Sequence, residues 1–232
     1  MANFSDNLVG HWLMNDDLAT TAVLDTTGVN NGVLTNAGNT EDVSVAGKIN
    51  KALDFDGVDD YVEIPDNNSL HFGTGDFSLC TWFLTSSING VIIAKDVYTQ
   101  ADAFELFIYS HYLRLGSNGN YTTVISQNVL DDGKFHFVVA GRKGNDAFLY
   151  VDGISQGTFT NFFLGLTITN THPLSIGKRL TGSATPFTGL LDDVRIYDTA
   201  ISAYYIKLLY NNGAGTEDEN VQSNTLLLGC NF

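Results

Sequence analysis

Apolar and polar residues alternate in short runs along most of this chain, and turn-forming residues separate the runs roughly every ten residues. A period of two is typical of strands with one buried face. The pattern therefore predicts an all-β sandwich of two antiparallel sheets. The expected strands lie within 8–13, 51–64 (a hairpin turning at Asp56-Gly57), 76–84, 90–95, 103–115, 133–153, 174–177 and 187–197.

One short helix is predicted near the C-terminal end. Ser202 is a good N-cap, the helix covers Ala203 to Tyr210, and Asn211-Asn212-Gly213 ends it. We expect residues 1–213 to form one domain. Residues 214–232 form an acidic link and then an apolar run, 225–232, which is predicted to add a strand or to join the chain to a partner or to further copies of itself.

The longest stretch without alternation is the polar segment 14–40. Long loops inside compact domains are usually functional. This one carries oxygen ligands that suit a hard cation, although their spacing is not that of an EF-hand. The same residue types also form Asx-turns, so both interpretations stay open. The side chains concerned are Asp16, Asp17, Asp25, Asn30 and Asn31.

The stretch 189–197 predicts a strand with a carboxylate in an unusual place. Asp192 shares its parity with Leu190, Val194 and Ile196, so it is expected among residues that face a core. An unpaired carboxylate there would cost several kcal/mol or more. Because basic residues are scarce in this chain, a calcium ion or a set of backbone N–H groups is the expected partner.

Aromatic residues occur on both faces of the predicted strands in 103–115. The outer face of an antiparallel sandwich is usually polar, so aromatic residues there need an explanation. Exposed rings could stack on sugars, and the alternatives are a subunit interface or a curved-sheet core. The residues proposed as ligand-binding are Phe107, Tyr109, Tyr112 and Tyr121. His11 and His136 alternate with apolar neighbours. His11 is interpreted as structural or surface, with metal binding as the alternative, and His136 as a sheet histidine rather than a catalytic one.

Charge narrows the choice of partners. The 232 residues include 26 Asp plus Glu against 11 Lys plus Arg, a net charge of −15, which disfavours nucleic acid and anionic membranes as partners. No signal peptide and no apolar run long enough for membrane insertion is visible. We expect an extracellular or virion-associated protein. Cys80 is expected to be a buried thiol, and the sequence does not decide whether it pairs with Cys230.

Five pieces in order resemble the laminin-G-like, concanavalin A-like jelly-roll domains of the LamG/pentraxin type. The resemblance covers about residues 8–213 and implies a two-sheet antiparallel jelly-roll sandwich. Phe135 stands where such domains usually have Trp, and Ile201 where they have Leu. The pieces are Leu53-Asp-Phe-Asp-Gly-Val-Asp-Asp-Tyr-Val-Glu-Ile64, Asp76-Phe-Ser-Leu-Cys-Thr-Trp82, Lys134–Ala140 leading to Leu149–Gly153, Leu174-Ser-Ile-Gly177, and Phe187–Tyr197 with Ala200-Ile-Ser202.

The resemblance also implies a calcium site in many members. By position it points to Asp25 and Asp192 as side-chain ligands, with backbone carbonyls around Gly28 to Asn31 completing the set. Ca²⁺ is therefore the expected cofactor.

Three functions are considered for this sequence, of which two are supported. The first is a non-catalytic, calcium-stabilised module that recognises carbohydrate or a glycan-coated surface. The second is a structural or adhesion component, such as a phage decoration, tail or fibre protein. An enzyme is disfavoured, because the Glu-x-Asp-x-Glu strand motif of related glucanases is absent and Glu217-Asp218-Glu219 lies in a polar link.

Overall fold

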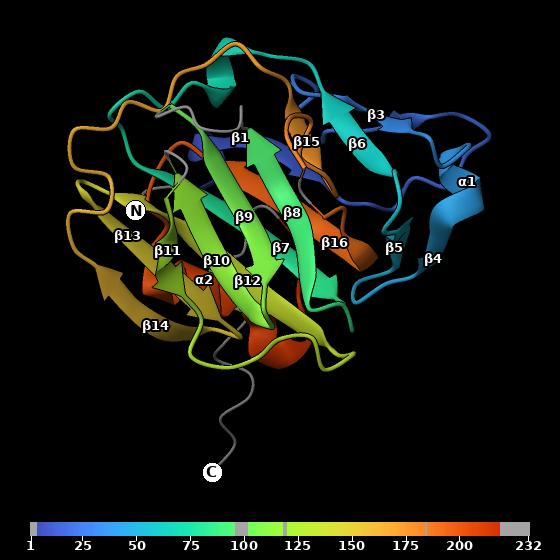
Figure 1. Ribbon diagram of the computed structural model, residues 1–232. Coiled ribbons are helices and arrows are strands. Elements are labelled where there is room, and N and C mark those ends of the chain that lie inside the picture. The colour runs from blue at the N-terminus through green and yellow to red at the C-terminus, as the bar shows by residue number, and fades with distance from the viewer. Residues whose placement is uncertain (1–3, 96–101, 118–119, 184, 219–232) are drawn as a thin grey trace.

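The computed structural model describes residues 4–95, 102–117, 120–183 and 185–218 (Figure 1). It contains two stacked sheets of eight strands each, and their pairings are antiparallel. The expected all-β jelly-roll sandwich with one short C-terminal helix is confirmed. In Figure 1 the sheet that contains β8, β9 and β10 faces the viewer, and the helix lies behind the other sheet.

The first sheet, sheet A, has the order β14-β13-β12-β7-β16-β5-β4, with β1 also paired to β16. The second, sheet B, has the order β11-β10-β9-β8-β15-β6-β3-β2. The strands of sheet A are β1 (Leu8–Trp12), β4 (Ser44–Ala46), β5 (Lys51–Asp56), β7 (Phe77–Leu84), β12 (Phe135–Lys143), β13 (Asp146–Val151), β14 (Ile154–Phe159) and β16 (Thr188–Tyr197). Those of sheet B are β2 (Ala22–Val23), β3 (Gly32–Thr35), β6 (Tyr61–Ile64), β8 (Asn89–Lys95), β9 (Phe104–Tyr109), β10 (Tyr112–Ser117), β11 (Asn120–Ile125) and β15 (Leu174–Ile176).

The main core lies between the two sheets. Alternate residues of each strand point into it, which is the physical content of the period-two pattern. Phe77 stacks on Phe72 at 4.9 Å between ring centres and lies 5.4 Å from Phe104.

A second apolar cluster lies on the other face of sheet A. Helix α2 (Ala203–Tyr210) covers that face and buries Tyr205, Ile206 and Leu209 against Trp82 and its neighbours. The predicted cap is confirmed, since the Ser202 side chain accepts from the Tyr205 N–H. Sheet A is therefore buried on both faces, so its alternation is weaker than that of a half-exposed sheet.

The segment 14–40 is more ordered than its composition indicates. It contains β2 and β3, and its last residue begins the short helix α1 (Thr40–Val43). The expectation of one long loop is wrong here, because Gly32–Thr35 hydrogen-bonds to β6 and extends sheet B. Strand pairing is a tertiary contact, and a four-residue strand leaves little periodicity to detect.

Two predictions concern residues at the end of the chain. The apolar run 225–232, including Cys230, lies outside the described residues. Cys80 is fully buried as expected, and burial raises the pKa of its thiol. Among the described residues no helix is both long and apolar enough to cross a membrane.

Candidate functional site

Strand β16 contains a bulge at the two aspartates. Asp192 pairs with Trp82 on β7 and Arg195 pairs with Cys80, so β16 holds one extra residue between them. Asp193 takes up the irregularity with φ of 50°. A one-residue slip moves the following side chains to the other face.

The prediction that Asp192 faces the same side of the sheet as Val194 and Ile196 is therefore wrong. Leu191, Val194 and Ile196 face the main core, whereas Asp192 lies beside Trp82 on the face that α2 covers. The predicted burial of Asp192 is confirmed, since its side chain is fully buried.

A backbone N–H group binds the Asp192 carboxylate. Ile49 N–H donates to Oδ2 at 2.8 Å, and the backbone of Lys48 also lowers the pKa of this carboxyl. Burial raises the pKa of Asp192 to about 7 against both effects, and the charges of Asp193 and Glu217 act in the same direction as burial. No described residue hydrogen-bonds to Oδ1. The sequence analysis expected either a calcium ion or backbone N–H groups as the partner of Asp192, and the structure shows a backbone N–H group in this role.

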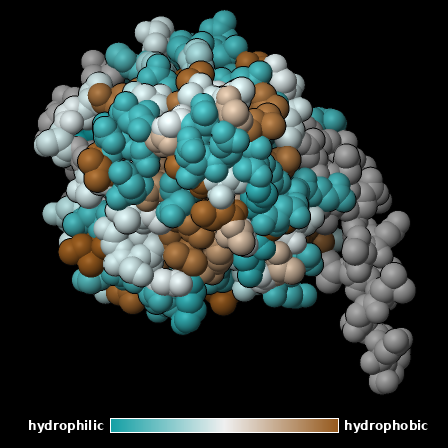
Figure 2. All heavy atoms as spheres, turned by 90° about the vertical axis from the view of Figure 1, so that its right-hand side faces the viewer, coloured by the Kyte–Doolittle hydropathy of each residue, from teal (hydrophilic) through white to brown (hydrophobic). Residues whose placement is uncertain are grey.

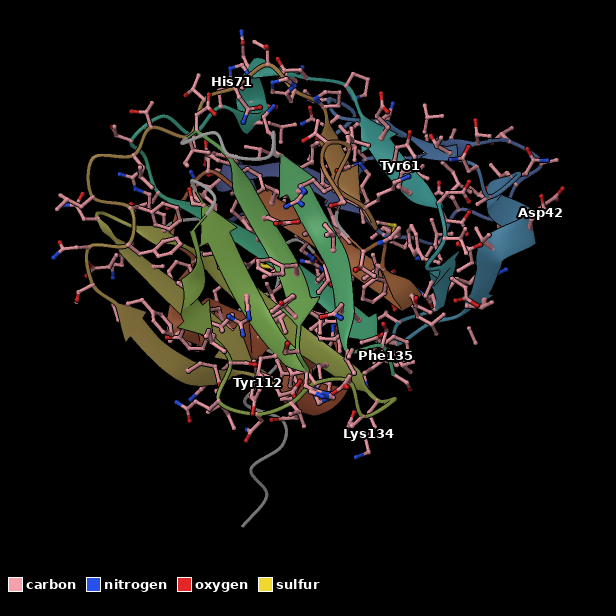
Figure 3. All side chains as sticks on the ribbon, viewed as in Figure 1. Asp42, Tyr61, His71, Tyr112, Lys134 and Phe135 are labelled. Carbon is pink, nitrogen blue, oxygen red and sulfur yellow. The ribbon has the colours of Figure 1, made fainter. Side chains whose placement is uncertain are left out.

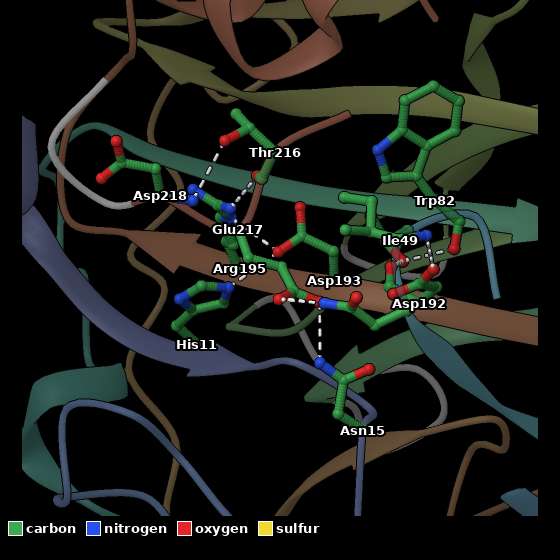
Figure 4. Close-up of polar contacts among 12 residues, drawn as sticks. His11, Asn15, Ile49, Trp82, Asp192, Asp193, Arg195, Thr216, Glu217 and Asp218 are labelled. Carbon is green, nitrogen blue, oxygen red and sulfur yellow. Dashed lines mark hydrogen bonds and ion pairs between the residues drawn. The ribbon is translucent and has the colours of Figure 1, made fainter. Parts of the chain in front are cut away.

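Asp193 belongs to a buried ionic group that the sequence reasoning missed. Its Oδ1 accepts from Arg195 Nε at 2.9 Å and lies 2.7 Å from His11 Nε2 (Figure 4). All three side chains are fully buried. Burial alone would raise the pKa of Asp193, but Arg195 and His11 outweigh it and hold that pKa below its usual value. His11 is thus structural, as expected.

The chain segment after α2 closes over this group. Arg195 Nη2 donates to the carbonyl of Thr216, and Glu217 accepts from the side-chain amides of Asn15 at 2.7 Å and Asn50 at 2.8 Å (Figure 4). Gly215 has φ of 75°, and a Cβ there would lie 2.6 Å from Ile49. Residues 214–218 therefore pack on the sandwich, and a side chain at 215 would separate them from it.

Three of the four residues predicted to bind calcium come together in one turn. The Asp25 carboxylate accepts the N–H groups of His11 at 2.8 Å, Thr27 at 3.0 Å and Asn30 at 2.8 Å. Asn31 Oδ1 accepts from Asp25 N–H, and Gly28 N–H donates to the Asp25 carbonyl. The N–H groups that donate to the Asp25 carboxylate belong to its own loop and to β1, whereas the donor to the Asp192 carboxylate is Ile49. The two aspartates therefore share none of these partners. Asx-type hydrogen bonding thus accounts for the turn at Asp25.

Another acidic group lies in the β5–β6 turn. Asp56, Asp59 and Asp60 bring carboxylate oxygens within 4.8 Å of one another, the one such trio among the described residues. Asp56 accepts from Val58 N–H at 2.7 Å, and Asp60 accepts from Asp56 N–H at 3.3 Å. These bonds define a turn, and nothing else in the geometry points to a ligand.

Figure 2 shows the side of the molecule with β3 and α1 as largely hydrophilic, with hydrophobic atoms in small separate patches.

The predicted aromatic face is partly covered by the chain itself. Phe107 is only 7% exposed and packs with Val91 and Ala94 on the outer face of sheet B. The loop after β15 reaches this face, because Arg179 pairs with Glu105 at 3.2 Å and Val91 N–H donates to the Thr185 carbonyl. The expected exposure of Phe107 is therefore wrong, because its neighbours on the sheet bury the ring.

The three tyrosines of that prediction differ from one another. Tyr109 is 54% exposed, and Tyr112 is half-buried at the opposite position on β10. The side chain of Tyr121 lies outside the described ones. Figure 3 shows Tyr112 at the lower end of the sandwich, the end that also carries Lys134 and Phe135.

His136 is a sheet histidine with both ring nitrogens bound, which confirms its structural interpretation. Nδ1 lies 2.8 Å from Asp152 Oδ2, and Nε2 lies 3.1 Å from Asp132 Oδ1. The hydrogen bond to Asp152 raises the pKa of His136, and Asp132 acts in the same direction. Lys134 and His136 lower the pKa of Asp132 to about 2.

His136 is expected to titrate above 6.5 in the folded protein. A raised folded-state pKa adds stability that is fully present below 6.5 and is lost as pH rises through the folded value. Asp152→Asn removes the larger cause and should move the pKa of His136 downwards. Imidazole NMR titration of both proteins measures this. Titration of His136 at or below 6.5 in the parent protein would contradict it.

Comparison with known proteins shows the family. The sequence model of the concanavalin A-like lectin/glucanases superfamily, laminin-G type, matches residues 56–207. The adhesion G-protein coupled receptor V1 of Danio rerio is 29% identical over 157 residues, which is 62% of this chain and 2% of that receptor. This chain therefore spans a very small part of its curated relative.

Solved structures agree in fold. The binding domain of Paraclostridial Mosquitocidal Protein 1 has a TM-score of 0.71 at 15% identity, covering 90% of this chain and 53% of that one. Domain 4 of the arabinanase AbnA from Geobacillus stearothermophilus, in complex with arabinotriose, has a TM-score of 0.66 at 16% identity, covering 90% of this chain and 98% of that domain. A Trypanosoma rangeli sialidase has a TM-score of 0.69 at 17% identity, covering 91% of this chain and 34% of the sialidase. The family match spans more than half of the chain, and the chain belongs to the laminin-G-type concanavalin A-like lectin/glucanases superfamily.

Proposed function

We propose that this chain is a non-catalytic recognition module that binds a glycan, or a glycan-coated protein, on a surface outside the cell. The observation that carries the proposal is the half-exposed Tyr109 ring at one end of sheet B, within a lectin-type sandwich. An exposed aromatic ring suits the apolar face of a sugar. Similar folds include a toxin binding domain and a domain in complex with arabinotriose.

The placement of the glutamates supports a non-catalytic role. Retaining hydrolysis needs two accessible carboxyl groups about 5 Å apart. Glu105 is buried in its pair with Arg179, and Glu217 is held by the amides of Asn15 and Asn50. The similar sialidase matches this chain over 34% of its own length.

The second candidate function is structural, as an adhesion component of a larger assembly such as a phage decoration, tail or fibre protein. The zebrafish adhesion receptor favours an adhesive role. In this case the apolar segment 225–232 would contact the partner, and glycan binding would be secondary or absent.

Calcium stays a prediction. Asp192 supports it with a buried Oδ1 that no described residue binds. Asp25 supports it less, because N–H groups of its own loop and of β1 already balance its charge. A bound ion would stabilise the fold by mass action.

A glycan array with the whole chain tests these proposals, read once with millimolar calcium and once with a chelator, alongside thermal melts in both buffers. We expect binding to at least one glycan. Binding and a melting temperature that fall together in chelator would support the calcium prediction, and an unchanged melting temperature would remove it. A parent chain that binds no glycan would shift the assignment to the structural role.

A further inference from the structure

The hairpin between β9 and β10 has an unusual turn. Its two central residues, Ser110 and His111, have φ of 50° and 77°. A two-residue turn with both φ values positive strongly favours Asn-Gly, because other side chains meet the backbone in this conformation. This chain uses Ser-His instead. Strain of this kind persists where the surrounding structure enforces it, and such sites are often functional.

Neighbouring loops enforce this turn. Ser110 N–H donates to the Asn89 side-chain oxygen at 3.0 Å, and His111 N–H donates to the Ile88 carbonyl at 3.1 Å. Leu130 N–H donates to the His111 carbonyl at 3.1 Å. The hairpin tip is thus bound to the loops before β8 and before β12, and its shape is set before any ligand arrives.

The His111 ring is oriented from one side. Its Nδ1 lies 2.7 Å from Asp131 Oδ2, while half of its side chain is exposed. Among the described residues none hydrogen-bonds to Nε2. An imidazole whose Nδ1–H donates a hydrogen bond to a carboxylate presents Nε2 in a fixed direction, where it can accept a hydrogen bond from a hydroxyl group.

The same hairpin carries an exposed aromatic ring two residues before His111. The Tyr109 ring precedes the turn, is 54% exposed, and has the Arg114 guanidinium 5.3 Å from its centre. Ile88 and Val129, on the two neighbouring loops, are each about half exposed. Three loops thus bring together a ring surface, aliphatic groups and an oriented hydrogen-bonding group.

We propose that this tip, formed by Ile88, Tyr109, His111, Val129 and Asp131, is the binding site for an uncharged sugar residue. A sugar ring stacks its C–H face on Tyr109, and one of its hydroxyl groups donates a hydrogen bond to His111 Nε2. The net charge of −15 and the carboxylate of Asp131 disfavour an anionic sugar. The inference rests on the proposed glycan recognition, and it adds the place and the ligand class.

Two variants and a control test the site. Tyr109→Ala removes the exposed ring. Tyr204→Ala is the matched control, because Tyr204 is 53% exposed on α2, which covers sheet A. The double variant Ser110→Asn, His111→Gly installs the favoured turn, so it should raise the melting temperature by about 2–4 °C while removing the imidazole. A loss of binding in this variant, with a melting temperature at or above that of the parent, cannot be attributed to unfolding.

All four proteins are applied to an array of neutral and sialylated oligosaccharides that includes arabinotriose, and affinities for the bound glycans are measured by calorimetry. We expect binding to a neutral glycan, at least tenfold weaker in Tyr109→Ala and in the double variant, and unchanged in Tyr204→Ala. Parent-like affinity in both tip variants would overturn the site but leave glycan recognition standing. Binding to sialylated glycans alone would overturn the ligand class. A parent chain that binds no glycan would overturn both proposals.

Discussion

Replacing Arg195 by methionine is expected to lower the free energy of unfolding by about 3–5 kcal/mol. Methionine retains much of the apolar bulk but leaves the fully buried Asp193 carboxylate with His11 alone. It also removes the donor to the Thr216 carbonyl, so residues 214–218 lose one of their attachments. Urea unfolding at neutral pH measures the change.

Two further variants identify the cause. Lys207→Met removes an exposed positive charge from α2, and surface changes of this kind usually stay within about 0.5 kcal/mol. The double variant Asp193→Asn, Arg195→Met removes the buried charge as well, and asparagine tolerates the positive φ at 193. It should be less destabilised than Arg195→Met alone. Equal or greater destabilisation would show that packing, and not the unpaired carboxylate, dominates the loss.

Replacing Trp82 by alanine is expected to cost about 3–5 kcal/mol of stability. The indole is buried between sheet A and α2, with its ring centre 5.2 Å from Phe137 and 5.7 Å from Tyr210. The Lys48 ammonium lies 5.0 Å from the same ring. Because Trp82 joins the helix to the sheet, its loss should also release α2.

Hydrogen exchange of the α2 amides separates this effect from general destabilisation. Phe77→Ala is the control, since Phe77 is an equally buried aromatic residue of the same strand that faces the main core. We expect Trp82→Ala to accelerate exchange in α2 relative to β7, and Phe77→Ala to accelerate both alike. The same exchange pattern in both variants would mean that α2 is held elsewhere.

Much of the fold could be predicted because the period of two is a local property. Runs such as Phe104-Glu-Leu-Phe-Ile-Tyr109 reveal a strand without knowledge of its partners, and Ser202 and Asn211 mark the helix ends through their own backbone preferences. Short strands were missed where periodicity is brief. Gly32–Thr35 is a strand because β6 pairs with it.

The candidate site was less predictable, because its features depend on contacts between distant segments. Phe107 has the sequence pattern of a sugar-stacking residue, but in the structure it is nearly buried and packs with Val91 and Ala94 of the neighbouring strand. His111 carries no signal in sequence, since its role depends on Asp131, twenty residues away, and on a turn conformation set by Ile88 and Asn89.

By itself, the sequence determined an all-β two-sheet sandwich of laminin-G type, its capped helix and the burial of Asp192. These follow from the side-chain alternation, from cap chemistry and from motifs that neighbouring residues carry. Only the tertiary structure decided the face on which Asp192 lies and the partners that it has. A bulge adds one residue to β16 opposite β7, and the N–H group that binds the carboxylate belongs to Ile49, 143 positions away. Backbone groups are identical in every residue except proline, so no sequence pattern announces them as ligands.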